Sequence, residues 1–144
     1  MNIKIKRLSK DAVIPQPAYN NDAGIDLVAI NDVDIQPGEC EKIHTGLAFE
    51  LPVNTFGAIC ARSGLASKRG LRPANCIGIC DSDYRGEYIV ALYNDSKEVQ
   101  HINKGDKIAQ LLILPVYSPS IEVVDELSDT DRGDGGFGSS GIRL

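Results

Sequence analysis

The sequence of 144 residues contains no tryptophan, and aromatic residues make up only 6% of it. A core built from this composition must be mainly aliphatic. No apolar run approaches the roughly 20 residues of a membrane-spanning helix, and the longest one is broken by Gln110 and Pro115. The N-terminus has charges but no apolar segment after them, so no secretory signal is predicted. We therefore expect a cytoplasmic, intracellular protein without a membrane partner.

An excess of basic residues is also missing. The chain has 15 Lys and Arg against 20 Asp and Glu, which gives a formal net charge of −5. A general nucleic-acid-binding protein usually presents a basic face, so nucleic acid is not an expected partner. Hydrophobic residues at 42% exclude wholesale disorder, and the length fits one domain with its own core.

Cysteine is present four times, but without the spacing of a metal site. Cys76 and Cys80 lack a second close pair, and His44 and His101 are not spaced as a pair of ligands. We therefore expect the cysteines to be small core residues that remain thiols, as is usual inside cells.

Short strands dominate the pattern of the chain. Alternating or dense apolar segments are bounded by Pro, Gly and Asn turns, which predicts many strands and almost no helix. These segments are residues 3–6, 32–35, 56–61, 87–92 and 107–114. Such spacing favours an all-β sandwich, jelly roll or barrel.

One segment, residues 63–70, predicts a short helix. It begins with Ser63 as a capping residue and ends with Lys68, Arg69 and Gly70, which are typical of a helix end. The unpaired N–H groups at its start, next to Arg62, are suited to an anion, although many such helices bind nothing.

The last 20 residues differ in composition from the rest. Residues 125–144 hold 5 of the 14 glycines and little that could pack in a core, so we divide the chain into a β domain, 1–124, and a tail, 125–144. Composition alone permits a disordered tail. The alternative is a flexible lid over an anion, because Gly N–H groups, Ser hydroxyls and Arg132 can hold phosphate while Phe137 offers a stacking face.

Residues 75–94 predict a hairpin-like unit, in which two apolar strands flank the polar turn 81–86. Asp81 directly follows an apolar run, so it lies at the edge of the core, where a carboxylate can be positioned as a base. The simpler interpretation is a turn carboxylate that caps backbone N–H groups.

Five motifs in order give the chain a close resemblance to one family. They are residues 22–27 (DAGIDL), 61–66 (ARSGLA), 78–87 (GICDSDYRGE), 105–111 (GDKIAQL) and 132–141 (RGDGGFGSSG). Over nearly its whole length the chain resembles the trimeric-type dUTPases, the deoxyuridine 5′-triphosphate nucleotidohydrolases. The sequence departs from the usual pattern at Ala61, Cys80 and Ser140, and none of these changes removes a group that the chemistry needs.

The resemblance implies the fold, the activity and the assembly. The fold would be a distorted jelly roll or β-barrel with one short helix and a flexible Gly-rich tail. The protein would hydrolyse dUTP to dUMP and pyrophosphate by attack of water at the α-phosphate, which limits uracil in DNA and supplies dUMP for thymidylate synthesis. It would be a homotrimer with active sites at subunit interfaces, and the tail would close over the site of a neighbouring subunit.

The resemblance also implies roles in catalysis and base recognition. Asp81 would orient and deprotonate the attacking water, and Tyr84 would pack on the deoxyribose and leave no room for a 2′-hydroxyl. The uracil edge would be recognised by Asn75 and by the backbone around Ile79 and Ile89.

The phosphates would be held by a second group of residues, Arg62, Ser63, Gly64 and Gln110. Asp26 would help to order metal-bound waters and neighbouring motifs. The metal would be Mg²⁺, held mainly by the nucleotide phosphates and water and not by protein ligands, since Mg²⁺ keeps several of its waters.

In the tail, the same resemblance assigns four contacts to the nucleotide. Phe137 would stack on uracil, while Arg132, Ser139 and Ser140 would clasp the β- and γ-phosphates.

Two alternatives remain open from the sequence. A dCTP deaminase of the same fold is associated with a catalytic Glu in the strand after the turn, and residues 90–94 (VALYN) contain no carboxylate. The other alternative is a dUTPase with an added regulatory role, in which the nucleotide-gated tail signals to a partner.

Overall fold

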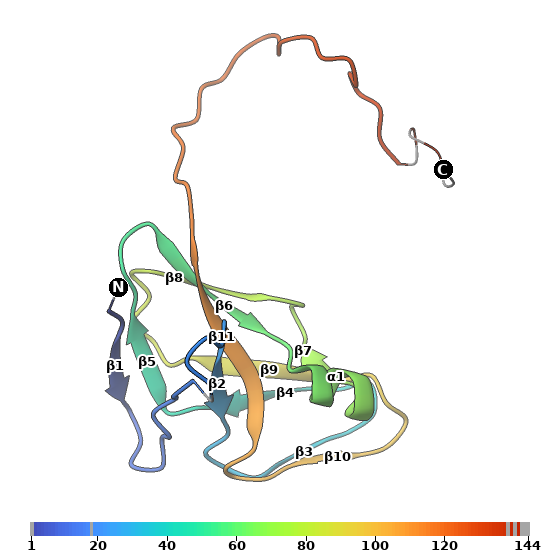
Figure 1. The fold of residues 1–144 in the computed structure, drawn as a ribbon. Helices are drawn as coiled ribbons and strands as arrows, with labels where there is room; N and C mark the ends of the chain where they lie inside the picture. The colour runs from blue at the N-terminus through green and yellow to red at the C-terminus, as the bar shows by residue number, and fades with distance from the viewer. Residues whose placement is uncertain (1, 18, 138, 140, 142–144) are drawn as a thin grey trace.

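The structure is a computed structural model that describes residues 2–17, 19–137, 139 and 141 (Figure 1). Eleven strands and one helix form within these ranges: β1 (Lys4–Arg7), β2 (Ile25–Val28), β3 (Val33–Ile35), β4 (Cys40–His44), β5 (Leu47–Glu50), β6 (Thr55–Cys60), α1 (Ser63–Arg69), β7 (Leu71–Pro73), β8 (Gly78–Asp81), β9 (Ile89–Asn94), β10 (Gln100–Ile102) and β11 (Lys107–Pro115). The predicted all-β class with one short helix is confirmed.

The strands form four antiparallel sheets. The largest has the order β2-β11-β6-β8, the next has the order β4-β9-β7, and two further pairs are β1-β5 and β10-β3. The nine residues of β11 pair on both edges, with β2 and with β6. The sheets thus bring segments together that are far apart in the sequence.

The core lies between these sheets and is mainly aliphatic, as predicted. Leu27 and Leu111 from the largest sheet and Ile43 and Leu92 from the three-stranded sheet are each at most 1% exposed. Packing of such side chains is the main stabilising contribution, on the order of 1.5–3 kcal/mol for each one fully buried. No helix in the described ranges is long and apolar enough to cross a membrane.

The helix ends as the sequence predicts, but it begins differently. Gly70 adopts φ 65° and donates its N–H to Leu65 O, after Lys68 and Arg69 in the last turn. The N-cap is Arg62 and not Ser63, and no side chain caps it. The prediction of Ser63 as the cap was therefore wrong, because the extended backbone before the helix ends one residue earlier.

The predicted hairpin-like unit at residues 75–94 is not a paired hairpin. β8 pairs with β6, whereas β9 pairs with β4 on one edge and β7 on the other. Since both edges of β9 are occupied, β8 cannot add to it. The two strands diverge into different sheets, and a space remains between them.

The cysteines are only partly where they were predicted. All four are free thiols, as expected, but Cys40 and Cys76 are exposed, while Cys60 and Cys80 are half-buried. Cys40 opens a strand at the surface, and Cys76 lies in a turn with φ 64°. The local backbone therefore turns two of them out of the core.

The chain leaves the body of the molecule after β11. The Val116 N–H still donates to Asn54 O at 2.9 Å, but the described residues beyond it form no strand or helix, and they extend away from the sheets (Figure 1). The boundary between residues 124 and 125 stays a prediction.

Candidate active site

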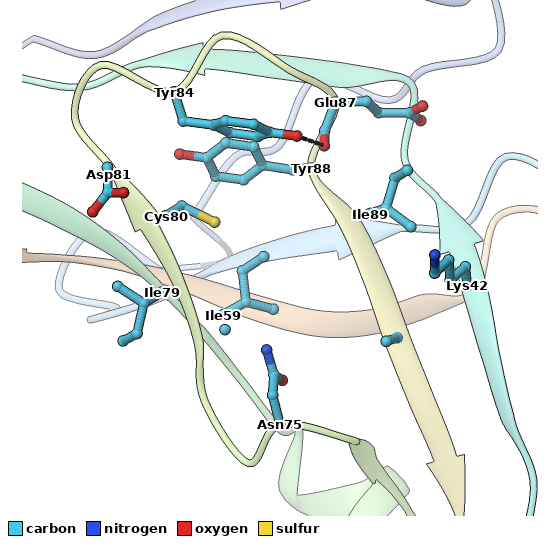
Figure 2. Close-up of a pocket in the computed structure, with 12 residues that line it drawn as sticks. Lys42, Ile59, Asn75, Ile79, Cys80, Asp81, Tyr84, Glu87, Tyr88 and Ile89 are labelled. Atoms are coloured by element: carbon cyan, nitrogen blue, oxygen red, sulfur yellow. Dashed lines mark hydrogen bonds between the residues drawn. The ribbon is translucent and has the colours of Figure 1, made fainter.

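The space between β8 and β9 is a pocket of about 370 Å³ (Figure 2). It is lined by all five residues that the sequence assigned to base and sugar recognition or to catalysis: Asn75, Ile79, Asp81, Tyr84 and Ile89. We call it the base pocket. Its apolar side chains are unusually open, with Ile79 62% and Tyr84 46% exposed. Exposed apolar surface in a hollow is typical of a ligand site.

Tyr84 is held over this pocket by its own loop. The Tyr84 N–H donates to Asp81 O at 3.1 Å, and its hydroxyl donates to Glu87 O at 3.3 Å (Figure 2). The ring lies so close to Gly86 that a Cβ there would overlap it. The turn therefore fixes the aromatic ring beside the Asp81 carboxylate.

The far end of the same loop is anchored to the turn between β4 and β5. Glu87 accepts the Gly46 N–H at 2.7 Å and pairs with His44 Nδ1 at 2.9 Å. The buried Thr45 hydroxyl donates to Tyr88 O at 2.6 Å. These bonds hold the start of β9 away from β8, which keeps the pocket open.

Seven further residues that were not predicted as site residues line the base pocket: Lys42, Ile59, Gly78, Cys80, Glu87, Tyr88 and Ala91. Burial raises the pKa of the Cys80 thiol, and Asp81 adds to the effect, so the thiol stays protonated near neutral pH. Tyr88 follows Glu87 in a strand-like pattern, which identifies a buried position but carries no sign of a ligand.

A second pocket, of about 380 Å³, lies where β2, β11 and the start of α1 meet. It is lined by the five residues outside the tail that were assigned to the phosphates and their support: Asp26, Arg62, Ser63, Gly64 and Gln110. We call it the phosphate pocket. Residues of three sequence motifs thus meet at one place.

Ion pairs connect those motifs. Asp26 Oδ1 pairs with Arg62 Nε at 2.8 Å, and Asp26 Oδ2 pairs with Lys107 Nζ at 2.8 Å. Asp26 thus contacts residues of the second and the fourth motif, while its predicted role in ordering these motifs and metal-bound water stays a prediction. Lys107 was missed as a site residue, although its place beside Gln110 in the fourth motif was a usable signal.

Close packing positions Gln110 in the same pocket. Its Nε2 donates to Ala61 O at 2.9 Å. A Cβ on Gly24 would lie 2.9 Å from Gln110 Oε1, so glycine is needed where the first motif passes the fourth. Gln110 is therefore fixed next to Arg62.

The two pockets of one chain do not meet. Their linings share no residue, and Asp81 and Gln110 lie at opposite ends of β6, because Gln110 pairs with Cys60 while Asp81 pairs with Phe56. Four residues of strand span about 13 Å. Asp81 and Arg62 of one chain are thus not arranged around one phosphate.

The described tail residues lie outside both pockets. Arg132 Nε donates to Gly135 O at 2.8 Å, and Arg132 and Ser139 line a hollow formed by the tail itself. The Phe137 side chain is fully exposed. Ser140, the fourth predicted tail contact, lies outside the described residues.

The described metal-binding side chains of one chain do not gather into a metal site. In the described part of the chain, no group of three or more His, Cys, Asp and Glu residues lies close enough to hold a metal ion. Asp26, the carboxylate between Arg62 and Lys107 in the phosphate pocket, is already committed to these two cations. The protein residues of a single chain therefore do not fit an all-protein Mg²⁺ site.

Comparison with known families agrees with the arrangement of the motifs. A family model described as dUTPase matches residues 10–141. The chain belongs to the dUTPase family.

Individual dUTPases resemble this chain along nearly its whole length. The deoxyuridine 5′-triphosphate nucleotidohydrolase of Nautilia profundicola is 50% identical over 141 residues, which are 98% of this chain and 99% of that protein. The enzyme of the same name from Gloeothece citriformis is 46% identical over 142 residues, 99% of this chain and 98% of that protein.

Solved dUTPase structures share the fold. The Staphylococcus bacteriophage 80alpha dUTPase with dUpNHpp superposes with a TM-score of 0.88 at 31% identity, covering 98% of this chain and 99% of that one. A mutant dUTPase from phage phi11 of S. aureus, whose structure shows coordination of a structural Mg(II) ion, has a TM-score of 0.80 at 27% identity, covering 88% of this chain and 98% of that one. The predicted jelly-roll fold is thereby confirmed.

Proposed function

We propose that this protein hydrolyses dUTP to dUMP and pyrophosphate. The base pocket between β8 and β9, with the Asp81 carboxylate at one end, is the observation that carries the proposal. Membership of the dUTPase family supports the same substrate. The activity would remove dUTP before uracil enters DNA and would supply dUMP for thymidylate synthesis, and we propose the cytoplasm as its location.

Uracil would enter the gap between the two strands. Asn75, Ile79 and Ile89 line this gap, and the Asn75 amide and the backbone at Ile79 and Ile89 would supply donors and acceptors for one edge of the base. Cytosine would present the opposite polarity at one position, and the methyl group of thymine would need space that a narrow gap lacks. The Tyr84 ring would cover the deoxyribose where a ribose carries its 2′-hydroxyl.

The reaction would occur at the Asp81 end of the pocket. Asp81 would accept a proton from a water molecule while the water oxygen bonds to the α-phosphorus. The bond from this phosphorus to the oxygen that bridges to the β-phosphate would break, and pyrophosphate would leave with the bonding electrons. A positioned base and a water held in line lower the barrier through orientation and proton transfer.

Charge on the leaving group would be stabilised by cations and N–H donors of the phosphate pocket. Arg62 would donate to phosphate oxygens, with Ser63, Gly64 and Gln110 beside it, and Asp26 would keep Arg62 in position. Fixed donors of this kind are most effective when water is excluded.

The tail would complete this enclosure. Arg132, Ser139 and Ser140 would clasp the β- and γ-phosphates, and Phe137 would stack on the base. The described tail residues are exposed apart from Gly135, and they are rich in glycine, so the triphosphate and the base would supply the interactions that order them.

Mg²⁺ would come with the substrate. Because the protein residues do not form a metal site within one chain, the ion would be held mainly by phosphate oxygens and water. When bound, it would neutralise part of the triphosphate charge.

The separation of the two pockets supports a homotrimer. Asp81 of one subunit would face the phosphate pocket of a second, and a tail would close the site. A closed ring of three subunits generates three such composite sites from one heterologous interface.

Release of pyrophosphate from dUTP, dTTP, dCTP and UTP, with and without Mg²⁺, tests the proposal. We expect rapid Mg²⁺-dependent release from dUTP alone. Comparable turnover of the other three nucleotides, or ammonia from dCTP, would overturn it. Sedimentation of the active protein as a monomer would contradict the trimer.

A further inference from the structure

Lys107 is a cation of the phosphate pocket to which the phosphate contacts assigned above give no role. It lies at the start of β11 and lines the pocket together with Arg62 and Gln110, and its side chain is 49% exposed. In the described part of the chain its one ion pair is with Asp26 Oδ2, at 2.8 Å. An ammonium group has three N–H donors. Lys107 therefore keeps donors that a ligand in the pocket can reach.

A register shift in β11 turns Lys107 toward the pocket. In a regular strand, successive side chains point to opposite faces, so Lys107 would share the buried face of Ala109. The pairing of β11 with β2 is irregular between these two residues, and Ile108 and Ala109 are both buried, at 1% and 0% exposure. Irregularities of this kind redirect a side chain and are frequent next to active sites. Lys107 can thus line the same pocket as Gln110.

The charge balance of the pocket depends on Lys107. Among the described residues that line the pocket, two carboxylates, Asp22 and Asp26, stand against two cations, Arg62 and Lys107. Without Lys107 these side chains would carry one net negative charge, which repels a polyphosphate. The second cation therefore removes an electrostatic barrier to the ligand.

Asp26 sets the positions of the two cations. One carboxylate oxygen pairs with Arg62 and the other with Lys107, so the cations lie on either side of a single carboxylate. Two cations placed in this way suit two successive phosphate groups of one chain, because each cation then meets its own set of phosphate oxygens.

We propose that Lys107 is a substrate-binding residue that donates hydrogen bonds to the pyrophosphate part of the nucleotide, beside the phosphate group that Arg62 holds. The proposal rests on the function proposed above, in which the β- and γ-phosphates leave together. No proton moves in this contact. The ammonium group stabilises the negative charge that develops on the leaving oxygen and its phosphate neighbours.

Calorimetric titration with ligands that differ in their phosphates tests the contact. Lys107→Met keeps the length of the side chain and removes its charge and donors. Its affinity for a non-hydrolysable dUTP analogue and for inorganic tripolyphosphate should fall about tenfold, near the low end for a hydrogen bond to a charged group, because the side chain is half-exposed. Its affinity for dUMP, which lacks the leaving phosphates, should stay unchanged. Lys107→Arg, which keeps the charge, should restore binding of the analogue.

A second background distinguishes a direct contact from support of Asp26. If Lys107 acted only by holding Asp26, Lys107→Met would have no further effect in a protein that already carries Asp26→Asn. If Lys107 itself contacts phosphate, the loss of affinity for the analogue should persist in that background. Lys104→Met is the matched control, since Lys104 pairs with Asp11 at 2.9 Å and lines neither pocket. It should leave all three affinities unchanged.

The contact and the proposed function can fail separately. Equal loss of affinity for the analogue and for dUMP, or no loss in the Asp26→Asn background, would overturn the contact, while hydrolysis of dUTP by the wild type would leave the function standing. If the wild type did not hydrolyse dUTP, weaker binding of tripolyphosphate by Lys107→Met would still support the contact. A wild-type protein that binds neither the analogue nor tripolyphosphate would overturn it.

Discussion

The base pocket and the phosphate pocket are built in opposite ways. The base pocket is a gap between two strands that belong to different sheets, and exposed apolar side chains border it. In the phosphate pocket, ion pairs connect the lining side chains, with Asp26 between Arg62 and Lys107. Recognition of the edge of a base requires backbone N–H and C=O groups without a partner, and space for the base between them. Binding of a polyanion requires cations whose positions are fixed before the ligand binds.

The difference extends to what each pocket lacks. The phosphate pocket holds the cations Arg62 and Lys107. Among the described residues that line it, Asp22 is the only carboxylate that is not paired with these cations. The base pocket holds the exposed Asp81, and Lys42 is the only cation among the described residues that line it. Neither pocket therefore holds both Asp81 and Arg62, which is the physical argument for an assembly.

The largest expected effect is in the base pocket. Asp81→Asn keeps the shape of the side chain but cannot accept the proton, so turnover should fall by about 10²–10⁴ while nucleotide binding persists. Stopped-flow or steady-state pyrophosphate release, with calorimetry of a non-hydrolysable analogue, measures both. Turnover at the wild-type rate would move the base elsewhere, with Asp83 as the next candidate.

Loss of the tail should affect the two pockets together. A protein that ends at Thr130 lacks Arg132 and Phe137, and its turnover should fall by about 10², comparable to the loss of one fixed donor in an oxyanion site. Its melting temperature should hardly change, because the tail packs little on the body. Near-normal turnover would make the tail an appendage, and loss of the fold would make it a structural arm.

A smaller effect is expected from the ion pairs of the phosphate pocket. Asp26→Asn should lower kcat about tenfold, because Arg62 is no longer held in one position. KM should change little, because two effects on substrate binding oppose each other. Arg62 is held less firmly, but a negative charge beside the phosphates is removed. Asp34→Asn is the control, as it breaks only an exposed pair with His101. An unchanged kcat in Asp26→Asn would show that Arg62 needs no support.

The smallest effect should come from the turn under Tyr84. In Gly86→Ala the new methyl group would overlap the Tyr84 ring and push it from its place. Selectivity for dUTP over UTP should then fall about three- to fivefold, as the 2′ position is covered less tightly. The ratio of kcat/KM for the two nucleotides measures this. Unaltered selectivity would mean that Tyr84 does not read the sugar.

Local signals in the sequence were enough for the elements and the motif residues. Alternation of apolar residues located β1, a dense apolar run located β11, and Gly70 located the end of α1, because each signal depends on neighbours within a few positions. The assignment of Asn75 and Tyr84 to one pocket, and of Arg62 and Gln110 to another, came from the family resemblance. Lys107 was missed although it lies in the fourth motif, and Tyr88 was missed because nothing in its local pattern distinguishes a site residue from a core residue.

By itself the sequence determined an aliphatic all-β domain, the place of its short helix, and the order of five motifs. Only the tertiary structure decided that β8 and β9 do not pair, that Asp26 lies between Arg62 and Lys107, and that Tyr88 lines the base pocket. These features depend on which strands occupy each edge and in which register. Such choices are made between residues tens of positions apart, where the alternation along a single strand carries no information.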